Sequence, residues 1–376
     1  MFTNLEVLMK RDVGMFCPQK GGNITVETVG PGHPDKVCDQ ISDAVLDAAL
    51  AGDPNSRVAI ETGGKTFITL IGEMTTASVI DLPELAMKVH REIGYNDDEV
   101  SGVHVDVVQQ SPDIALGTNS QRRGAGDQGT MVGYAVDTPD HGYMPIAYHV
   151  ARRLVMRLDD VRKAGTLSFL RPDNKSQVVM RDGKVVHVTI ATQHTDDVST
   201  EDLRHAVHKE IIVPVVGDIE FEACTINGTG RFVKGSFAAD AGETGRKIVC
   251  DAYGARVPVG GGAYSGKDPS KVDRTAAYMA RYIAKTIVAR HMAEEALIHL
   301  AYTIGQIDPD SVDVCVYNPS DPEFDFERWV RDTFPLSPGG MIDLFDLTRP
   351  QGWSYRETAA YGHYGHPQFP WEKVVL

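Results

Sequence analysis

Three pairs of short β-strand patterns, each joined by a tight turn, constrain the fold of this chain more than any other feature. In the second pair, SQVVMR and KVVHVTIAT flank Asp182-Gly183, a dipeptide that strongly favours a two-residue hairpin turn. Strands joined in this way pair antiparallel. The pairs are predicted at 56–62 with 66–74, at 176–181 with 184–192, and at 299–307 with 312–318.

Amphipathic helices are predicted between these hairpins, because apolar residues recur there every three or four positions. The last predicted helix begins at Pro269, with Asp268 as its N-cap. Since strands pair as hairpins and helices separate the pairs, the pattern predicts an α+β fold with antiparallel sheets. The predicted helices are 34–50, 84–93, 146–164 and 269–287.

Length and composition narrow the class of protein. A chain of 376 residues is too long for one ordinary core, and we expect two or three domains. The net charge of −15 argues against nucleic acid as a partner. Five widely spaced cysteines without a C-x-x-C pair fit a reducing compartment. With no apolar run of about 18 residues, we expect no membrane association and a cytoplasmic location.

A glycine-rich segment, GGGAYSGKDPSKVDR (260–274), resembles a phosphate-binding P-loop but has Asp268 where that loop needs Ser or Thr. Lys267 and Lys271 lie beside a predicted helix start, where free N–H groups attract anions. A lysine near a phosphate is worth roughly 4 kcal/mol, against ~0.3–1 kcal/mol for the helix dipole. Asp273 suits a hard divalent cation. The alternative is a capped turn with solvated lysines.

A second segment, GPGHPDKVCDQISDA (30–44), repeats this combination of glycine, helix start and charged side chains. His33 and Lys36 are predicted to contact phosphate, and Asp35 to bind a metal ion. The alternative is a turn before a capped helix.

Two further segments are rich in glycine or in interleaved charges. RRGAGDQGTMVGYA (122–135) follows the polar loop SPDIALGTNSQ (111–121), which is predicted to be a lid, with a plain surface connection as the alternative. GRFVKGSFAADAGETGRKIVCDAYG (230–254) offers Phe232, Asp240 and the pair Arg246-Lys247. Here the alternative is a core aromatic with solvated charges. Lysine and aspartate together suit a metal–polyphosphate ligand.

Taken together, these segments resemble the S-adenosylmethionine synthetases (methionine adenosyltransferases). The resemblance covers about residues 23–373, and the motifs occur in the order of that family. They are GHPDK with DQISDAVLDA, GAGDQG, RPDNKSQV, GRFV, AGETGRK, GGGAYSGKDPSKVDR and ETAAYGHYG with FPWEK.

The resemblance implies three similar α+β domains related by a pseudo-threefold axis. It implies an N-terminal extension at 1–22 and domains at 23–116, 117–235 (with the gate loop) and 236–376, interleaved in space. It also implies a homodimer or homotetramer with active sites between subunits. ATP and L-methionine would give S-adenosylmethionine, and the released triphosphate would be hydrolysed to diphosphate and phosphate. Mg²⁺ would be required, and K⁺ would assist.

Matching positions imply the roles of individual residues. Catalytic roles fall to His33, Lys175, Arg246 and Lys267. ATP contacts fall to His33, Asp173, Lys175, Arg231, Phe232, Asp240, Arg246, Lys247, Ala263 and Lys267. Methionine contacts fall to Glu73, Gln110, Asp240 and Lys271. Metal sites fall to Asp35 and Asp273 for magnesium and to Glu61 for potassium.

The chain also departs from the family pattern. Gly30-Pro31 replaces the usual Ser-Glu, residues 235–239 replace a glycine-rich segment, and the gate loop is shorter. A non-catalytic paralogue that binds nucleotide is the alternative from another class, and the retained lysines and aspartates argue against it. A P-loop kinase is disfavoured by Asp268 and by the antiparallel strand pattern.

Overall fold

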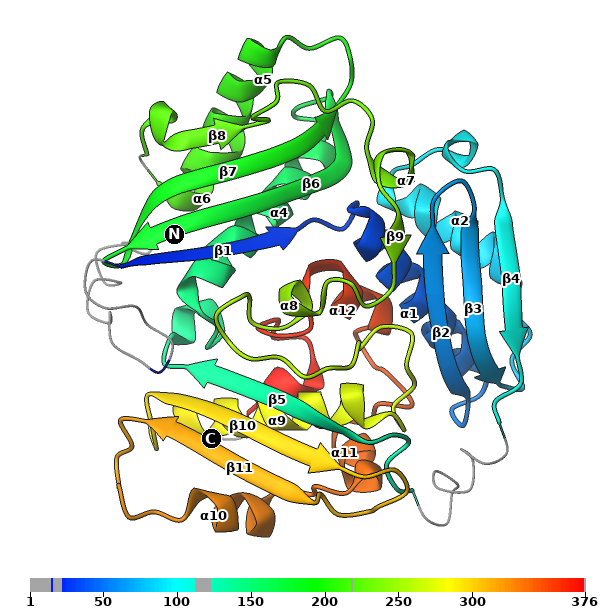
Figure 1. Ribbon diagram of the computed structural model, residues 1–376, viewed down its shortest axis with the longest axis vertical. Helices are drawn as coiled ribbons and strands as arrows, with labels where there is room; N and C mark the ends of the chain where they lie inside the picture. Colours follow the sequence, from blue (N-terminus) through cyan, green and yellow to red (C-terminus); the bar gives the residue numbers. More distant parts are fainter. Residues whose placement is uncertain (1–14, 16–21, 112–122, 218, 375–376) are drawn as a thin grey trace.

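Three β-sheets surround a group of helices at the centre of the molecule (Figure 1). The computed structural model describes residues 15, 22–111, 123–217 and 219–374. Each sheet packs against one long helix: β2 on α1, β1 and β6 on α4, and β5 and β10 on α9. The predicted arrangement of three similar α+β units is confirmed.

The strands form sheets in the orders β1-β6-β7-β8, β4-β3-β2-β9 and β11-β10-β5. Their bounds are β1 Asn23–Val29, β2 Arg57–Gly64, β3 Ile68–Thr75, β4 Val103–Val108, β5 Gly129–Val136, β6 Leu170–Arg181, β7 Lys184–His194, β8 Cys224–Ile226, β9 Gly242–Glu243, β10 Glu295–Tyr302 and β11 Ser311–Tyr317. The helices are α1 Pro34–Gly52, α2 Leu82–Ile93, α4 Ile146–Lys163, α5 Thr200–Val207, α6 Val213–Val216, α7 Ser236–Ala239, α8 Ile248–Asp251, α9 Val272–Ala289, α10 Phe326–Thr333, α11 Pro338–Phe345 and α12 Tyr355–Tyr361.

Each sheet contains a strand from a distant part of the chain. The first strand, β1, pairs with β6, while β5 pairs with β10 and β9 pairs with β2. The exchange is cyclic, because each third of the sequence contributes a strand to the sheet of another third (Figure 1). The three units therefore share their sheets as well as a common centre, and segments far apart in the sequence lie side by side.

The three predicted hairpins are confirmed as β2–β3, β6–β7 and β10–β11. The predicted extent of one strand, 299–307, is wrong, since β10 begins at Glu295 and ends at Tyr302. Gly305 has a φ of 74°, which turns the chain out of the sheet soon after that strand. Two pairings, β3–β4 and β7–β8, are parallel rather than antiparallel.

The predicted start of the fourth helix is also wrong, because α9 begins at Val272 and its N-cap is Lys271. The Asp268 carboxylate is occupied elsewhere: it accepts the N–H of Val58 at 2.7 Å and that of Ser270 at 2.9 Å. Asp268 thus anchors the loop before α9 to β2 rather than capping the helix.

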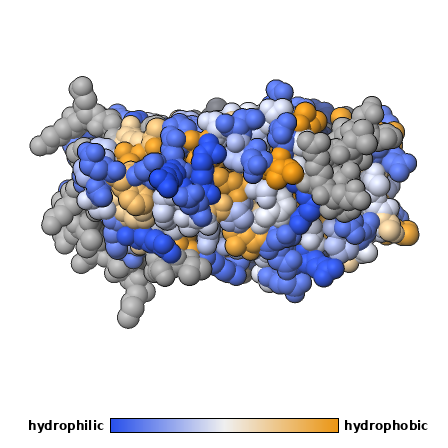
Figure 2. Space-filling model, turned by 90° about the horizontal axis from the view of Figure 1, so that it is seen from below, coloured by the Kyte–Doolittle hydropathy of each residue, from blue (hydrophilic) through white to orange (hydrophobic). Residues whose placement is uncertain are grey.

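The surface is largely polar. In the view from below, hydrophobic residues appear as separate groups within a mainly hydrophilic face (Figure 2). Among the helices that the structure describes, none combines the length and apolar character needed to cross a membrane. The described cysteines, Cys38, Cys224, Cys250 and Cys315, form no disulfide.

Candidate active site

The site begins at the N-terminus of α1, where His33 is the N-cap. Its Nδ1 accepts the backbone N–H of Asp35 at 3.2 Å, and Pro34 occupies the first helical position. Because Nδ1 accepts, the ring proton of neutral His33 lies on Nε2. Burial, with the nearby charges of Lys247 and Lys175, lowers the pKa of His33 to about 3. His33 is therefore a neutral imidazole whose Nε2–H is a hydrogen-bond donor.

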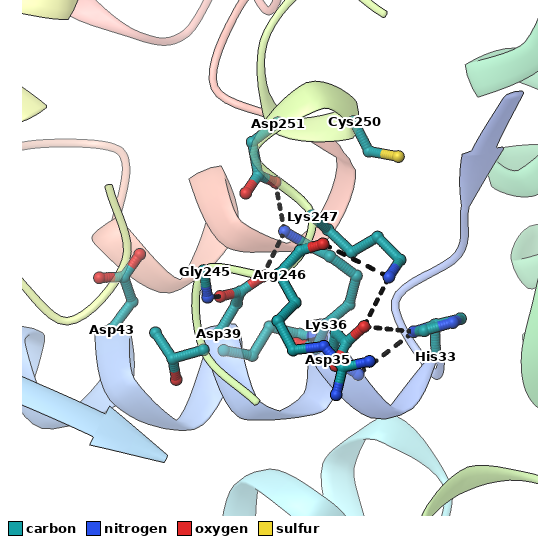
Figure 3. A network of polar contacts seen from close by, with 12 residues as sticks. His33, Asp35, Lys36, Asp39, Asp43, Gly245, Arg246, Lys247, Cys250 and Asp251 are labelled. Atoms are coloured by element: carbon teal, nitrogen blue, oxygen red, sulfur yellow. Dashed lines mark hydrogen bonds and ion pairs between the residues drawn. The ribbon is translucent and has the colours of Figure 1, made fainter. Parts of the chain in front are cut away.

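Asp35 gathers cations from a segment more than 200 positions away (Figure 3). Lys247 Nζ lies 2.5 Å from Oδ2, and Arg246 Nε lies 3.7 Å from Oδ1. The backbone N–H of Glu243 donates to Oδ1 at 2.9 Å. Burial raises the pKa of Asp35, but these hydrogen bonds outweigh it and hold the pKa below its ordinary value. Asp35 is an ionised carboxylate at neutral pH.

Lys267 and Asp273 form a second ion pair at 2.7 Å. The loop that carries Lys267 lies directly against the loop of Arg246: a Cβ added to Gly245 would approach the Cβ of Ala263 to 2.6 Å. The loop whose cations pair with Asp35 is thus in contact with the loop that carries Lys267. Cations and carboxylates from separate predicted segments meet there, as an anionic ligand with a metal ion requires.

The strand register places Lys267 on the outer face of the sheet β4-β3-β2-β9. Lys267 forms a bridge with Ala59, and Ala59 lies opposite Glu73. Paired residues share a face, and residues two apart along a strand do so too, so Glu61 lies on this face as well. Gln110 follows β4, and its N–H lies 3.2 Å from Thr75 Oγ1. Glu61, predicted for potassium, and Glu73, predicted for methionine, therefore lie on the sheet face shared by Lys267, and Gln110 lies beside it.

Asp173 and Lys175 lie on β6, the strand that pairs with β1 just before the His33 turn. Lys175 is exposed and pairs in register with Val29, just before the His33 turn. Asp173 accepts the N–H of Ser236 at 2.9 Å. Burial raises the pKa of Asp173, and the charge of Asp240 adds to this effect, whereas the N–H of Ser236 and the charge of Lys175 oppose it. The resulting pKa of Asp173 is about 6. Asp240 is the C-cap of the short helix α7, whose first residue, Ser236, donates to Asp173.

Three predicted site residues have partners other than the charged side chains around Asp35. Arg231 is exposed and pairs with Asp196 at 2.8 Å. Phe232 donates its N–H to His194 Nε2 at 3.0 Å. Lys271 Nζ lies 2.5 Å from Asp268 Oδ2, so its charge is directed towards the buried anchor of the loop. Roles for these residues in ligand binding stay predictions.

The structure contradicts the prediction that Lys36 contacts phosphate. Lys36 is buried, and its Nζ donates to Asp39 at 3.0 Å and to Asp251 (Figure 3). Two carboxylates neutralise its charge, so none remains for an anionic ligand. Asp39, Asp43 and Asp251 were missed, although the spacing of aspartates at every fourth position of α1 is a signal in the sequence.

The predicted magnesium and potassium sites can be tested against the side chains that surround them. Mg²⁺ is commonly held by one or two carboxylates together with substrate phosphate oxygens. Asp35 and Asp273 fit that requirement, and Gly262 leaves space at Asp273, because a Cβ there would lie 2.1 Å from Oδ1. Over the described ranges, no three His, Cys, Asp or Glu side chains gather to hold a metal ion. Within those ranges, Glu61 therefore has no such group around it.

Apart from Ser111, the predicted gate loop lies outside the described residues, and so does the N-terminal extension apart from Met15 and Gly22. The described chain resumes at Arg123, which pairs with Asp343 at 2.8 Å. Asp127, a few positions further on, is exposed.

Comparison with known proteins matches nearly the whole chain. Three family models follow one another: the S-adenosylmethionine synthetase N-terminal domain over residues 23–115, central domain over 122–232 and C-terminal domain over 234–373. An S-adenosylmethionine synthase of a Nitratiruptor species is 46% identical over 373 residues, which cover 93% of this chain and 95% of that protein. One of Wolinella succinogenes is 45% identical with the same coverage.

The chain is a multi-unit α+β enzyme built of three sheet-and-helix units. Its candidate site lies where lysine, arginine and aspartate side chains of separate segments meet, at the start of α1 and in the loop before α9. The chain belongs to the S-adenosylmethionine synthetase family.

Proposed function

We propose that this enzyme forms S-adenosylmethionine from ATP and L-methionine, and that it then hydrolyses the released triphosphate to diphosphate and phosphate. The observation that carries the proposal is the convergence of His33, Asp35, Arg246 and Lys247 beside the loop of Lys267. The family match and the names of the relatives support it.

In the first step, the methionine sulfur attacks C5′ of ATP. A carbon–sulfur bond forms, the C5′–O bond breaks, and the electron pair of that bond leaves on the triphosphate. Sulfur attacks without losing a proton, so no general base is needed. The barrier falls because the reactants are aligned, which can contribute ~7–11 kcal/mol, and because cations stabilise the departing charge.

The residues divide between these tasks. His33 donates Nε2–H to the departing oxygen, while Lys175, Arg246, Lys247 and Lys267 contact the triphosphate. Arg246 and Lys267 also serve the hydrolysis, in which water attacks phosphorus and a P–O bond breaks. Asp173, Arg231, Phe232, Asp240 and Ala263 complete the ATP site. Glu73, Gln110, Asp240 and Lys271 bind methionine.

Magnesium held by Asp35 and Asp273 would neutralise part of the triphosphate charge. Potassium at Glu61 would need ligands beyond those of a single exposed carboxylate. Removing Mg²⁺ with a chelator tests whether the reaction requires this ion, and we expect turnover to be lost.

A second copy of the chain would complete the site. Ile71 and Val108 are 44% and 59% exposed and lie on the outer sheet face together with Glu61 and Glu73. A homodimer or homotetramer would cover these apolar side chains and bring a second set of charges to the bound ligands.

We also propose domains at 23–116, 117–235 and 236–376, and a cytoplasmic location.

The direct test is to incubate the purified chain with ATP, L-methionine and Mg²⁺ and to quantify S-adenosylmethionine, diphosphate and phosphate. We expect all three products in equal amounts, and none of the sulfonium product when methionine is left out. Folded protein that binds ATP but forms no S-adenosylmethionine would contradict the proposal and favour a non-catalytic paralogue. Triphosphate released without further cleavage would contradict the second step alone.

A glycine substitution tests the magnesium assignment. Replacing Gly262 with alanine places a methyl group against the Asp273 carboxylate, so we expect a roughly 10–100-fold loss of magnesium affinity. Gly261→Ala is the matched control, because a Cβ at Gly261 meets nothing within 4 Å. The magnesium dependence of turnover measures both. Equal dependence in the two variants would show that the space at Asp273 does not matter.

A further inference from the structure

Helix α1 carries four aspartates on one stripe, at positions 35, 39, 43 and 47. Carboxylates four residues apart repel one another and disfavour an isolated helix. In the folded chain, each accepts backbone N–H groups from segments about 200 to 300 residues away. The pairs are Asp35 with Glu243, Asp39 with Gly245, Asp43 with Gly266, and Asp47 with Tyr355 and Arg356. Their tertiary partners thus offset the repulsion.

Asp39 holds one end of the segment that carries Arg246 and Lys247. Its Oδ1 accepts the N–H of Gly245 at 2.9 Å, and its Oδ2 accepts from Lys36 Nζ at 3.0 Å. The same ammonium group donates to Asp251 at the other end of the segment (Figure 3). Asp39, Lys36 and Asp251 therefore clamp residues 245–251 at both ends, while the two cations between them turn towards Asp35.

Asp43 holds the second loop in a similar way. Its Oδ1 accepts the N–H of Gly266 at 2.8 Å, and its Oδ2 lies 2.5 Å from Arg274 Nη2. Arg274 Nη1 in turn donates to the carbonyl of Lys267 at 2.9 Å. The buried pair Asp43–Arg274 thus grips the backbone on both sides of the Gly266–Lys267 peptide. From this fixed peptide, the Lys267 side chain extends to the Asp273 carboxylate.

We propose that Asp39 and Asp43 are positioning residues, which register the Arg246–Lys247 loop and the Lys267 loop against α1. Neither carboxylate contacts the ligand in this assignment, because both are fully buried and occupied. They act through the two loops whose cations hold the triphosphate. The inference rests on the proposed function, since it names what holds that site in place.

The experiment compares Asp39→Asn and Asp43→Asn with Asp47→Asn. Asp47 lies on the same stripe but accepts only from the start of α12 in the contacts above, so Asp47→Asn is the matched control. A displacement of about 1 Å far from the chemistry can cost 10²-fold. We expect kcat to fall roughly 10²-fold in the first two variants, with the KM for methionine changed less than about twofold. Asp47→Asn should lower the melting temperature and keep kcat.

Calorimetric titration with magnesium and inorganic tripolyphosphate gives a readout that does not need turnover. We expect Asp39→Asn and Asp43→Asn to weaken this binding at least about tenfold, and Asp47→Asn to leave it unchanged. Unchanged kcat and tripolyphosphate affinity in both variants would overturn the proposal. An equal loss of kcat and tripolyphosphate affinity in Asp47→Asn would overturn it as well, because removing any one carboxylate charge from α1 would then have the same effect.

Two further measures keep the test decisive. If Asp39→Asn does not fold, the apolar triple substitution Lys36→Met, Asp39→Leu and Asp251→Leu removes the clamp without leaving a buried charge unpaired. It should lose tripolyphosphate binding while remaining folded, and retained binding would overturn the role of the clamp. If the unmodified chain forms no S-adenosylmethionine, the proposed function fails, and tripolyphosphate binding still tests the positioning residues separately.

Discussion

Replacing His33 with asparagine is expected to lower the turnover of S-adenosylmethionine formation by roughly 10²–10³-fold, the effect of removing one donor to a developing oxyanion. Asparagine is among the best N-cap residues, so it can accept the Asp35 N–H that His33 Nδ1 now accepts. The helix start should therefore survive, while the Nε2–H donor is lost. Single-turnover kinetics measure the chemical step directly.

The control for this prediction is His33→Ala, which removes both the cap and the donor. We expect it to lose the same turnover and, in addition, about 0.5–2 kcal/mol of stability. If His33→Asn kept turnover within about tenfold of the unmodified chain, the Nε2 donor would have no part in the reaction. Because the pKa of His33 is about 3, its titration should not shape the pH–rate profile of the free enzyme between about pH 5 and 8.

Replacing Glu372 with glutamine is expected to destabilise the fold by about 3–5 kcal/mol, the usual cost of leaving a buried charge without its partner. Glu372 lies close to the end of the chain, beyond α12, yet its carboxylate reaches into the centre of the molecule. It accepts from Arg281 at 3.0 and 3.1 Å, from Lys285 at 2.8 Å and from the N–H of Gly365 at 2.7 Å. Arg281 is wholly buried and would lose its counter-charge.

The effect should depend on pH in a defined direction. Burial raises the pKa of Glu372, but Arg281 and Lys285 outweigh it and lower the pKa to about 2. Glu372 raises the pKa of Arg281 against burial, whereas burial wins at Lys285 and lowers its pKa, so Arg281 is the stronger partner. A carboxyl pKa below its unfolded value stabilises the fold above about pH 4.5, and this stabilisation is lost as the pH falls towards 2.

Urea unfolding at pH 7 and at pH 4 measures both parts of this prediction. The difference between the unmodified chain and Glu372→Gln should be large at pH 7 and smaller at pH 4. The exposed Glu323→Gln is the control, and we expect it to change stability by less than about 0.5 kcal/mol. A loss at Glu372 no larger than the loss at Glu323 would contradict the prediction.

Many residues of the candidate site can be singled out from local patterns in the sequence. His33, Asp35, Arg246, Lys247, Lys267 and Asp273 each stand beside a glycine-rich turn or a helix start, where a side chain can reach a ligand. Lys36 has the same local setting, and its assignment was wrong because burial beside Asp39 and Asp251 depends on a segment 215 positions away. Asp268 likewise reads as an N-cap, yet β2 takes its carboxylate. No local pattern encodes such partners.

The hairpins, the long helices and the residue types of the candidate site could be predicted from local sequence, because turn chemistry and apolar periodicity act over a few neighbouring positions. The cyclic exchange of β1, β5 and β9 and the pairing of charges in the interior became visible only in the folded chain. Both depend on contacts between distant segments, whose energy comes from burial and from charge pairing across the fold. Asp39 and Asp43 illustrate the division: their spacing is visible in the sequence, and their partners are visible only in the folded chain.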